Sequence, residues 1–125
     1  MTALRQADLH SLAARGVRVP AYDRDRVSIG AVHFGPGAFH RVHQACYLDD
    51  ALAQDGRWGI AAVSLHSAGV RDALAPQDGL YALAVLDEQP QTRMIGALKS
   101  LLVAPESPAA CSAAIRTRWR TTSCS

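Results

Sequence analysis

The sequence predicts an α/β fold with a parallel sheet, and three observations lead to that prediction. The chain has 125 residues and is 49% hydrophobic, which is enough for one packed domain. Two short apolar runs, 27–34 and 58–65, are rich in residues that favour strands. A glycine turn and a helix-like stretch separate them, and strand, turn, helix and strand within about 40 residues form a βαβ unit with a right-handed crossover.

The first element that the sequence predicts is a short helix over residues 3–14, which Gly16 ends. A loop follows, in which Pro20 favours extended backbone. Residues 27–34 (VSIGAVHF) are apolar on both faces, as is typical of a parallel strand that is covered on both sides. In the predicted helix over residues 3–14, the apolar positions are Leu4, Leu9 and Leu12.

Residues 39–53 are predicted to form the crossover helix, because apolar side chains recur there at spacings of three and four. Asp55 and Gly56 end this helix, and residues 58–65 (WGIAAVSL) form the second strand. The apolar positions of the helix are Val42, Ala45, Cys46, Leu52 and Ala53.

The remaining body of the chain predicts a helical turn and two more strands. The turn covers residues 70–75 and ends at Pro76. Residues 80–86 and 93–103 have strand character, and the loop DEQPQT separates them. A loop of this length between two strands predicts an antiparallel β-hairpin.

The composition argues against several classes of protein. The net charge is +2, and removing Arg116, Arg118 and Arg120 from the count leaves −1 for the rest of the chain. We therefore expect no nucleic-acid partner. Apolar runs fall far short of the roughly 20 residues that span a bilayer, and the N-terminus lacks a signal sequence, so we expect no membrane partner and a cytoplasmic location. The three cysteines show no metal-binding spacing.

A glycine turn directly follows the first predicted strand and is the strongest candidate for a binding site. A strand that turns sharply into a helix leaves backbone N–H groups free to bind phosphate, and a glycine lets a pyrophosphate approach closely. The turn matches the dinucleotide pattern GxGxxG except that a histidine replaces the third glycine. The candidate cofactor-binding residues are Gly35, Pro36, Gly37, Ala38, Phe39, His40 and Arg41.

Two alternatives remain open at this turn. The first is that the turn is a tight connection between strand and helix with no ligand. The second concerns Arg41, which either binds a phosphate or is a solvated helix residue. Many NAD enzymes place an acid at the end of the second strand, where it binds the ribose hydroxyls. Here residues 64–69 contain no acid, and Asp72 is the next one, so the sequence does not choose between NAD and NADP.

The histidines near the turn raise a metal-binding alternative. His40 and His43 are three residues apart, where two imidazoles on one helix face share a metal, and His33 lies close in sequence. No third ligand is evident, so we assign no metal site. Asp49 and Asp50 point in different directions from a helix and do not form a catalytic carboxylate pair.

The stretches VHFGPGAFHRVHQACYLDD and SLHSAGVRDALAPQDGLYAL resemble the mannitol dehydrogenase family, the polyol-specific long-chain dehydrogenases. The F-H-R-x-H-Q core after the glycines is specific to that family, and the resemblance extends from about Leu9 to Ala109. Within that family, the sequence most resembles fructuronate reductase, also called D-mannonate oxidoreductase. The resemblance implies a Rossmann-type domain, NAD as cofactor, and reversible oxidation of a polyol or sugar acid, such as mannitol to fructose or mannonate to fructuronate.

The resemblance also implies that a part of the family's machinery is missing here. Residues 1–109 correspond to the N-terminal part of a dinucleotide-binding domain, a βαβ unit plus a β-hairpin. The family's catalytic lysine lies in a later substrate domain, which this chain lacks. Lys99 is the single lysine and lies in the predicted hairpin, so we assign no catalytic residue. We expect the chain to be inactive alone; the alternative is a non-catalytic nucleotide-binding or structural remnant.

The tail, residues 110–125, departs from the resemblance and shows no convincing apolar periodicity. Because the composition changes abruptly there, we expect a frameshifted tail in place of the family's continuation. An incomplete parallel sheet leaves an edge strand without a partner. We therefore expect self-association through the exposed sheet edge.

Overall fold

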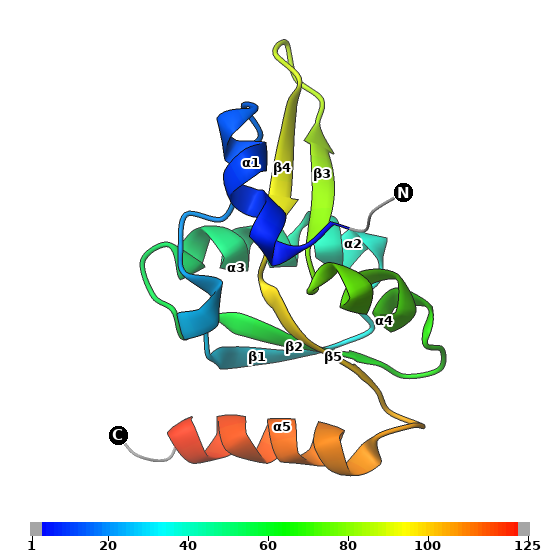
Figure 1. Ribbon diagram of the computed structural model, residues 1–125. Helices are drawn as coiled ribbons and strands as arrows, with labels where there is room; N and C mark the ends of the chain where they lie inside the picture. The colour runs from blue at the N-terminus through cyan, green and yellow to red at the C-terminus, as the bar shows by residue number, and fades with distance from the viewer. Residues whose placement is uncertain (1–3, 123–125) are drawn as a thin grey trace.

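A three-stranded parallel sheet lies at the centre of the computed structural model, which describes residues 4–122 (Figure 1). Its strands are β1 (Ile29–Phe34), β2 (Gly59–Ser64) and β5 (Leu98–Val103), in the order β1-β2-β5. Both pairs are parallel. The predicted α/β class and both strands of the βαβ unit are therefore confirmed, with strand ends shifted by one or two residues.

The middle strand, β2, forms the core of the molecule. All six of its residues are buried. Ile60 and Val63 are among the largest fully buried side chains, together with Leu98 on the neighbouring strand β5. A strand buried on both faces needs no alternation of polar and apolar residues, which explains the continuous apolar run in the sequence.

The crossover from β1 to β2 contains two short helices where the sequence predicts one. Helix α2 (Ala38–Val42) ends at His43, whose φ of −110° and ψ of −80° leave the helical region, and α3 (Gln44–Leu52) follows. The Tyr81 hydroxyl, which comes from another strand, donates to the main-chain oxygen of Arg41 at 2.5 Å. A side chain thus binds a carbonyl that a continuous helix pairs internally, and the prediction of one helix over 39–53 was wrong at this point.

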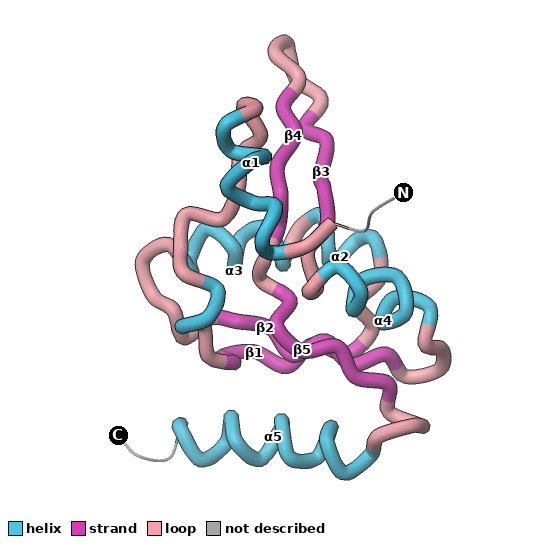
Figure 2. The backbone as a smooth tube through the Cα atoms, viewed as in Figure 1, coloured by secondary structure: helices cyan, strands magenta, loops and turns pink. Residues whose placement is uncertain are grey.

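The stretch 93–103 also divides, and only its first half joins the hairpin. Strand β3 (Tyr81–Val85) pairs antiparallel with β4 (Gln91–Ile95), which confirms the predicted hairpin (Figure 2). Gly96 then leaves the ladder, because its N–H donates to the Asp49 carboxylate at 2.9 Å and its oxygen accepts from Arg24 at 3.1 Å. The second half of the stretch becomes β5 of the parallel sheet, so Lys99 lies in that sheet and not in the hairpin as expected.

The N-terminal segment is less helical than predicted. A 3-10 turn, η1 (Gln6–Asp8), leads into a short helix, α1 (Leu9–Ala14), which ends before Gly16 as expected. No residue of η1 or α1 is buried, so the side of this segment that carries the leucines packs only partly against the rest of the domain. A second 3-10 turn, η2 (Arg24–Arg26), lies in the expected loop.

Between β2 and the hairpin, the predicted helical turn over 70–75 is present as α4 (Gly69–Leu74), and the 3-10 turn η3 (Ala75–Gln77) contains Pro76. Figure 1 shows α2, α3 and α4 on one face of the parallel sheet, with the hairpin and α1 extending beyond them. The sheet thus carries its connecting helices on one side.

The other face of the sheet is covered by the tail. Helix α5 (Pro108–Thr122) lies beneath β1 and β5 in Figure 1. A helix thus forms where the sequence shows no convincing apolar periodicity; within residues 108–116, Cys111 is buried and Ala114 and Ile115 are half-buried. The expected frameshift stays a prediction, and residues 123–125, which belong to it, lie outside the described part. No helix within residues 4–122 has the length and apolar character needed to cross a membrane.

Candidate functional site

The glycine turn begins where β1 ends, and hydrogen bonds tie it to β2. The N–H of Gly35 donates to the oxygen of Val63 at 2.9 Å, and the N–H of Gly37 donates to Gly35 at 2.8 Å. Gly35 has a φ of +80°, a left-handed conformation that favours glycine. Pro36 between them is buried. The sequence pattern therefore produces a rigid turn at the carboxyl end of the first strand.

The outer surface of this turn is open. A Cβ atom built on Gly37 would meet no heavy atom within 4 Å, so the backbone itself forms the surface there. Helix α2 starts at the next residue, and the N–H groups of Ala38, Phe39 and His40 in its first turn have no partner inside the helix. An exposed glycine backbone next to free N–H groups fits the pyrophosphate of a dinucleotide.

A cavity of about 300 Å³ lies between the turn and the end of β2. Parallel α/β sheets bind ligands outside the carboxyl ends of their strands, and this cavity occupies that position. No carboxylate is among the residues that line it. The lining residues are Gly35, Pro36, Gly37, Ser64, Leu65, His66, Ser67 and Val70.

A second cavity, of about 410 Å³, lies on the other side of the turn against α2 and α3, and its lining is mostly apolar. Its central feature is a stack of two imidazoles, His33 on β1 and His40 on α2, whose ring centroids are 3.6 Å apart. The lining residues are His33, Gly35, Gly37, Phe39, His40, His43, Gln44 and Tyr47.

His40 is buried, and a hydrogen bond from one of its two ring nitrogens fixes the ring. Its Nδ1 donates to the side-chain oxygen of Gln44 at 3.0 Å, and its Nε2 has no hydrogen-bond partner among the described residues. Burial, followed by the charge of His33, lowers the pKa of His40 below its usual value. The ring is therefore neutral near pH 7 and offers Nε2 as an acceptor.

The three histidines near the turn do not lie as the metal hypothesis requires, and the absence of a metal site stays a prediction. His40 stacks on His33, whereas His43 contacts the ring of Phe39 at a centroid distance of 4.4 Å. The helix breaks at His43, so the two histidines do not share one helix face as the metal hypothesis requires. Across residues 4–122, no three metal-ligating side chains come together.

Arg41, the last of the candidate residues, folds back over the turn. Its Nε lies 3.4 Å from the oxygen of Gly37, and the residue is half-buried. It is thus neither fully solvated nor pointing away from the glycine backbone. The structure brings all seven candidate residues together at one corner of the sheet, and their role in binding stays a prediction.

A buried carboxylate, which the sequence does not assign to a catalytic pair, supports this corner of the sheet. Asp49 on α3 accepts from the Tyr22 hydroxyl at 2.5 Å, from the Gly96 N–H at 2.9 Å and from Arg93 at 3.0 Å. Its place between Ala45 and Leu52, on the apolar face of the helix, is the signal that indicated burial. Asp49 therefore fixes α3 to the segment between β4 and β5.

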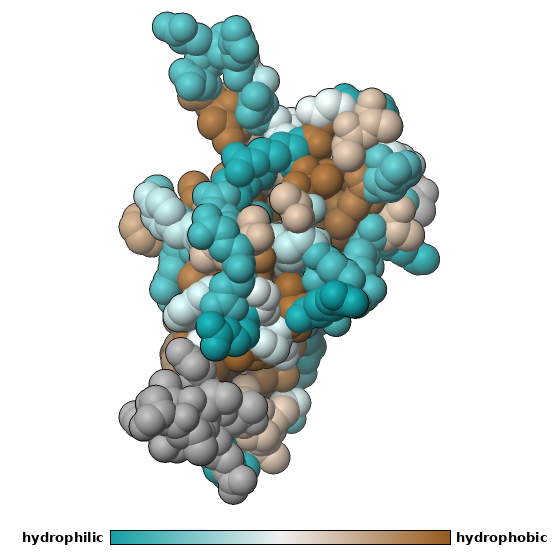
Figure 3. All heavy atoms as spheres, turned by 90° about the vertical axis from the view of Figure 1, so that its left-hand side faces the viewer, coloured by the Kyte–Doolittle hydropathy of each residue, from teal (hydrophilic) through white to brown (hydrophobic). Residues whose placement is uncertain are grey.

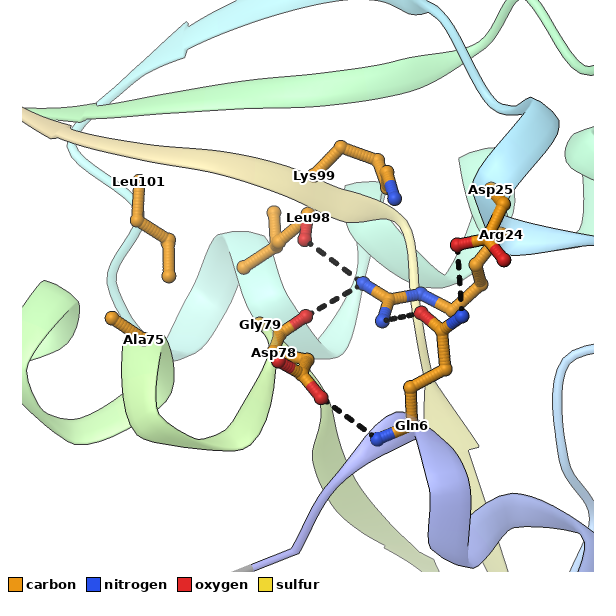
Figure 4. A pocket seen from close by; sticks show the side chains of 9 residues that line it. All are labelled: Gln6, Arg24, Asp25, Ala75, Asp78, Gly79, Leu98, Lys99 and Leu101. Carbon is orange, nitrogen blue, oxygen red and sulfur yellow. Dashed lines mark hydrogen bonds between the residues drawn. The ribbon is translucent and has the colours of Figure 1, made fainter.

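A third cavity, of about 530 Å³, contains Arg24 and Lys99 (Figure 4). Arg24 is buried and donates to the main-chain oxygens of Asp78 and Leu98, as Figure 4 shows, as well as to Gly96. Burial, followed by the charge of Arg24, lowers the pKa of Lys99. Lys99 is the second residue of β5, so it lies at the amino end of the parallel sheet and far from the glycine turn at the carboxyl end.

Comparison with known proteins identifies the domain type. The family model described as "Mannitol dehydrogenase Rossmann domain" matches residues 29–124. The match covers the glycine turn and all three parallel strands. It also continues through α5, beyond Ala109, where the sequence analysis placed the end of the resemblance.

Several curated and solved proteins are similar to the chain. A mannitol 2-dehydrogenase of Phaeosphaeria nodorum is 42% identical over 74% of the chain and 17% of its own length. A polyol:NADP oxidoreductase of Gluconobacter oxydans is 37% identical over 82% of the chain and 22% of its own length. The solved ternary complex of Pseudomonas fluorescens mannitol 2-dehydrogenase with NAD and D-mannitol aligns with a TM-score of 0.78 and 36% identity over 86% of the chain and 23% of that protein. The chain thus spans about a fifth of the length of these relatives.

Proposed function

The chain belongs to the mannitol dehydrogenase family, and from that premise we propose that it is the nucleotide-binding part of an NAD-dependent oxidoreductase. The reaction is the reversible oxidation of a CH–OH group. The proposed substrate is a polyol, as the names of the relatives support, or a sugar acid of the mannonate type. NAD bound at the glycine turn would supply the hydride acceptor for this oxidation.

The observation that carries the proposal is the open glycine backbone between β1 and α2. Gly37 presents no side chain to the cavity at the end of β2, and its neighbours Ala38, Phe39 and His40 offer free N–H groups beside it. These groups bind and orient the pyrophosphate, so that the rest of the nucleotide lies along the carboxyl ends of the strands. Helix α2 has five residues, so the individual N–H groups matter more here than the helix dipole.

We assign no base for the substrate hydroxyl among the described residues. A general base must lie within hydrogen-bond reach of the proton it takes. Lys99 lies at the amino end of β5 beside Arg24, at the opposite end of the sheet from the glycine turn. We therefore propose that the 125-residue chain binds the nucleotide without turning over substrate on its own.

Gly37→Ala tests the proposed site. Gly37 has a φ of −75°, which alanine adopts readily, and its added Cβ meets no protein atom within 4 Å. The stability of the variant should stay within about 1 kcal/mol of the unchanged chain. Because the methyl group enters the space of the pyrophosphate, the affinity for NADH should fall about tenfold or more, measured by titration of nucleotide fluorescence.

Gly56→Ala is the matched control. Gly56 lies before β2, at the amino end of the sheet, and its added Cβ meets only the oxygen of Arg26 at an ordinary 3.6 Å. Its affinity for NADH should equal that of the unchanged chain. Equal NADH binding by both variants, or no NADH binding by the unchanged chain, contradicts the proposal. Turnover of mannitol or mannonate by the isolated chain contradicts the second part, that binding occurs without catalysis.

A further inference from the structure

The polar groups that line the cavity at the end of β2 bear on whether the chain binds NAD or NADP. In dinucleotide-binding folds a carboxylate at this strand end accepts hydrogen bonds from the adenosine ribose, and its charge disfavours a 2′-phosphate. In this chain the strand ends in Ser64, which is buried, and the exposed residues His66 and Ser67 follow. All three line the cavity, and no carboxylate does.

The first acid in the sequence after the residues that line this cavity is Asp72, and an arginine binds it. Asp72 on α4 accepts from Nε and Nη2 of Arg71 at 3.1 and 3.0 Å. Glu106 accepts from Nη1 of the same guanidinium. One arginine thus binds one oxygen of each of the two carboxylates.

The side chains of Ser64, His66 and Ser67 can bind either a ribose hydroxyl or a 2′-phosphate. A serine hydroxyl donates to a phosphate oxygen and also accepts from a ribose hydroxyl, and a histidine imidazole does the same through its two nitrogens. We propose that this cavity accepts a 2′-phosphate, so that the chain binds NADPH with an affinity within about tenfold of that for NADH. This inference rests on the proposed function.

The experiment is a pair of titrations of the 125-residue chain, with NADH and with NADPH, at one salt concentration. Dissociation constants within about tenfold of each other support the inference. NADH binding with NADPH weaker by more than that overturns the inference and leaves the proposed function standing. Binding of neither nucleotide overturns both.

Ser67→Asp places a carboxylate at the strand end and locates the effect. Ser67 is exposed, so the substitution is compatible with the fold, and a melting curve followed by circular dichroism checks this. Repulsion between the new charge and the 2′-phosphate should raise the ratio of the NADPH to the NADH dissociation constant more than about tenfold. Ser67→Asn, of the same size but uncharged, should keep the ratio of the unchanged chain. An unchanged ratio in Ser67→Asp shows that the 2′-phosphate lies elsewhere and overturns the assignment of this cavity.

Discussion

At the scale of single residues, Asp49 and Asp50 are neighbours in sequence with very different surroundings. Asp49 is 5% exposed and accepts hydrogen bonds from Tyr22, Gly96 and Arg93. The Asp50 side chain is half-exposed and pairs with Arg18 at 3.2 Å and Arg93 at 2.6 Å. A buried carboxylate with several donors supports the fold far more than an exposed ion pair does.

We therefore expect Asp49→Ala and Asp50→Ala to differ in stability. Asp49→Ala leaves Arg93 without its buried partner and should lower the free energy of unfolding by about 3 to 5 kcal/mol. Asp50→Ala removes the exposed pair with Arg18 and a contact with Arg93, which keeps its buried partner Asp49, and should cost about 1 kcal/mol. Urea unfolding followed by circular dichroism measures both values. Equal losses in the two variants contradict the assignment of Asp49 as the structural anchor.

Single residues also show what the sequence could reveal about the site. The turn from Gly35 to Arg41 was predictable, because its glycines are close together and their effect is local. The roles of Arg24 and Asp49 were not, because their hydrogen-bond partners lie 18 to 74 residues away. The break at His43 is likewise indicated by no local pattern.

At the scale of elements, tertiary contacts divided two stretches that local pattern joins. The apolar spacing over 39–53 correctly predicted helix and the buried face, but the Tyr81 hydroxyl binds Arg41 and separates α2 from α3. The β character of 93–103 correctly predicted strand, but Asp49 and Arg24 bind Gly96 and direct the second half into the parallel sheet. Hydrogen bonds from distant residues thus overrode continuity along the chain.

Helix α5 packs against β1 and β5, and Cys111 is buried among its residues 108–116, whose side chains the structure describes. Cys111→Asp places a carboxylate against β1 and β5, and we expect a loss of about 2 kcal/mol or more in the free energy of unfolding. Ser112→Asp adds the same charge at the exposed neighbouring position and should change the free energy by less than about 0.5 kcal/mol. Thermal melts of the two variants compare these effects. A harmless Cys111→Asp means that α5 is not held on the sheet.

At the scale of the whole molecule, the sheet and its surface leave apolar groups exposed. In the described residues β1 and β5 each have a partner on one side only. Large hydrophobic side chains are exposed beside the glycine turn, Phe39 at 79% and Tyr47 at 73%. Figure 3 shows hydrophobic atoms reaching the surface between hydrophilic ones on the face it presents. Unpaired strand edges and apolar patches promote association.

We therefore expect the 125-residue chain to self-associate in solution. Light scattering during size-exclusion chromatography should give a mass above that of one chain, and the mass should rise with concentration. Replacing Phe39 and Tyr47 by serine removes two exposed apolar side chains and should shift the distribution toward the monomer. A chain that is monomeric at high concentration and melts in one sharp transition contradicts this expectation.

The buried Arg24 has a consequence for how the protein is made. Its main-chain partners at Asp78, Gly96 and Leu98 lie 54 to 74 residues further along the chain. A ribosome releases residues in order, at about 5 to 20 per second, so several seconds separate the appearance of Arg24 from that of Leu98. Until Asp78 has emerged, the guanidinium has none of these carbonyl partners, and until Leu98 has emerged the sheet lacks β5. We therefore expect the N-terminal part of the nascent chain to stay open until β5 has emerged.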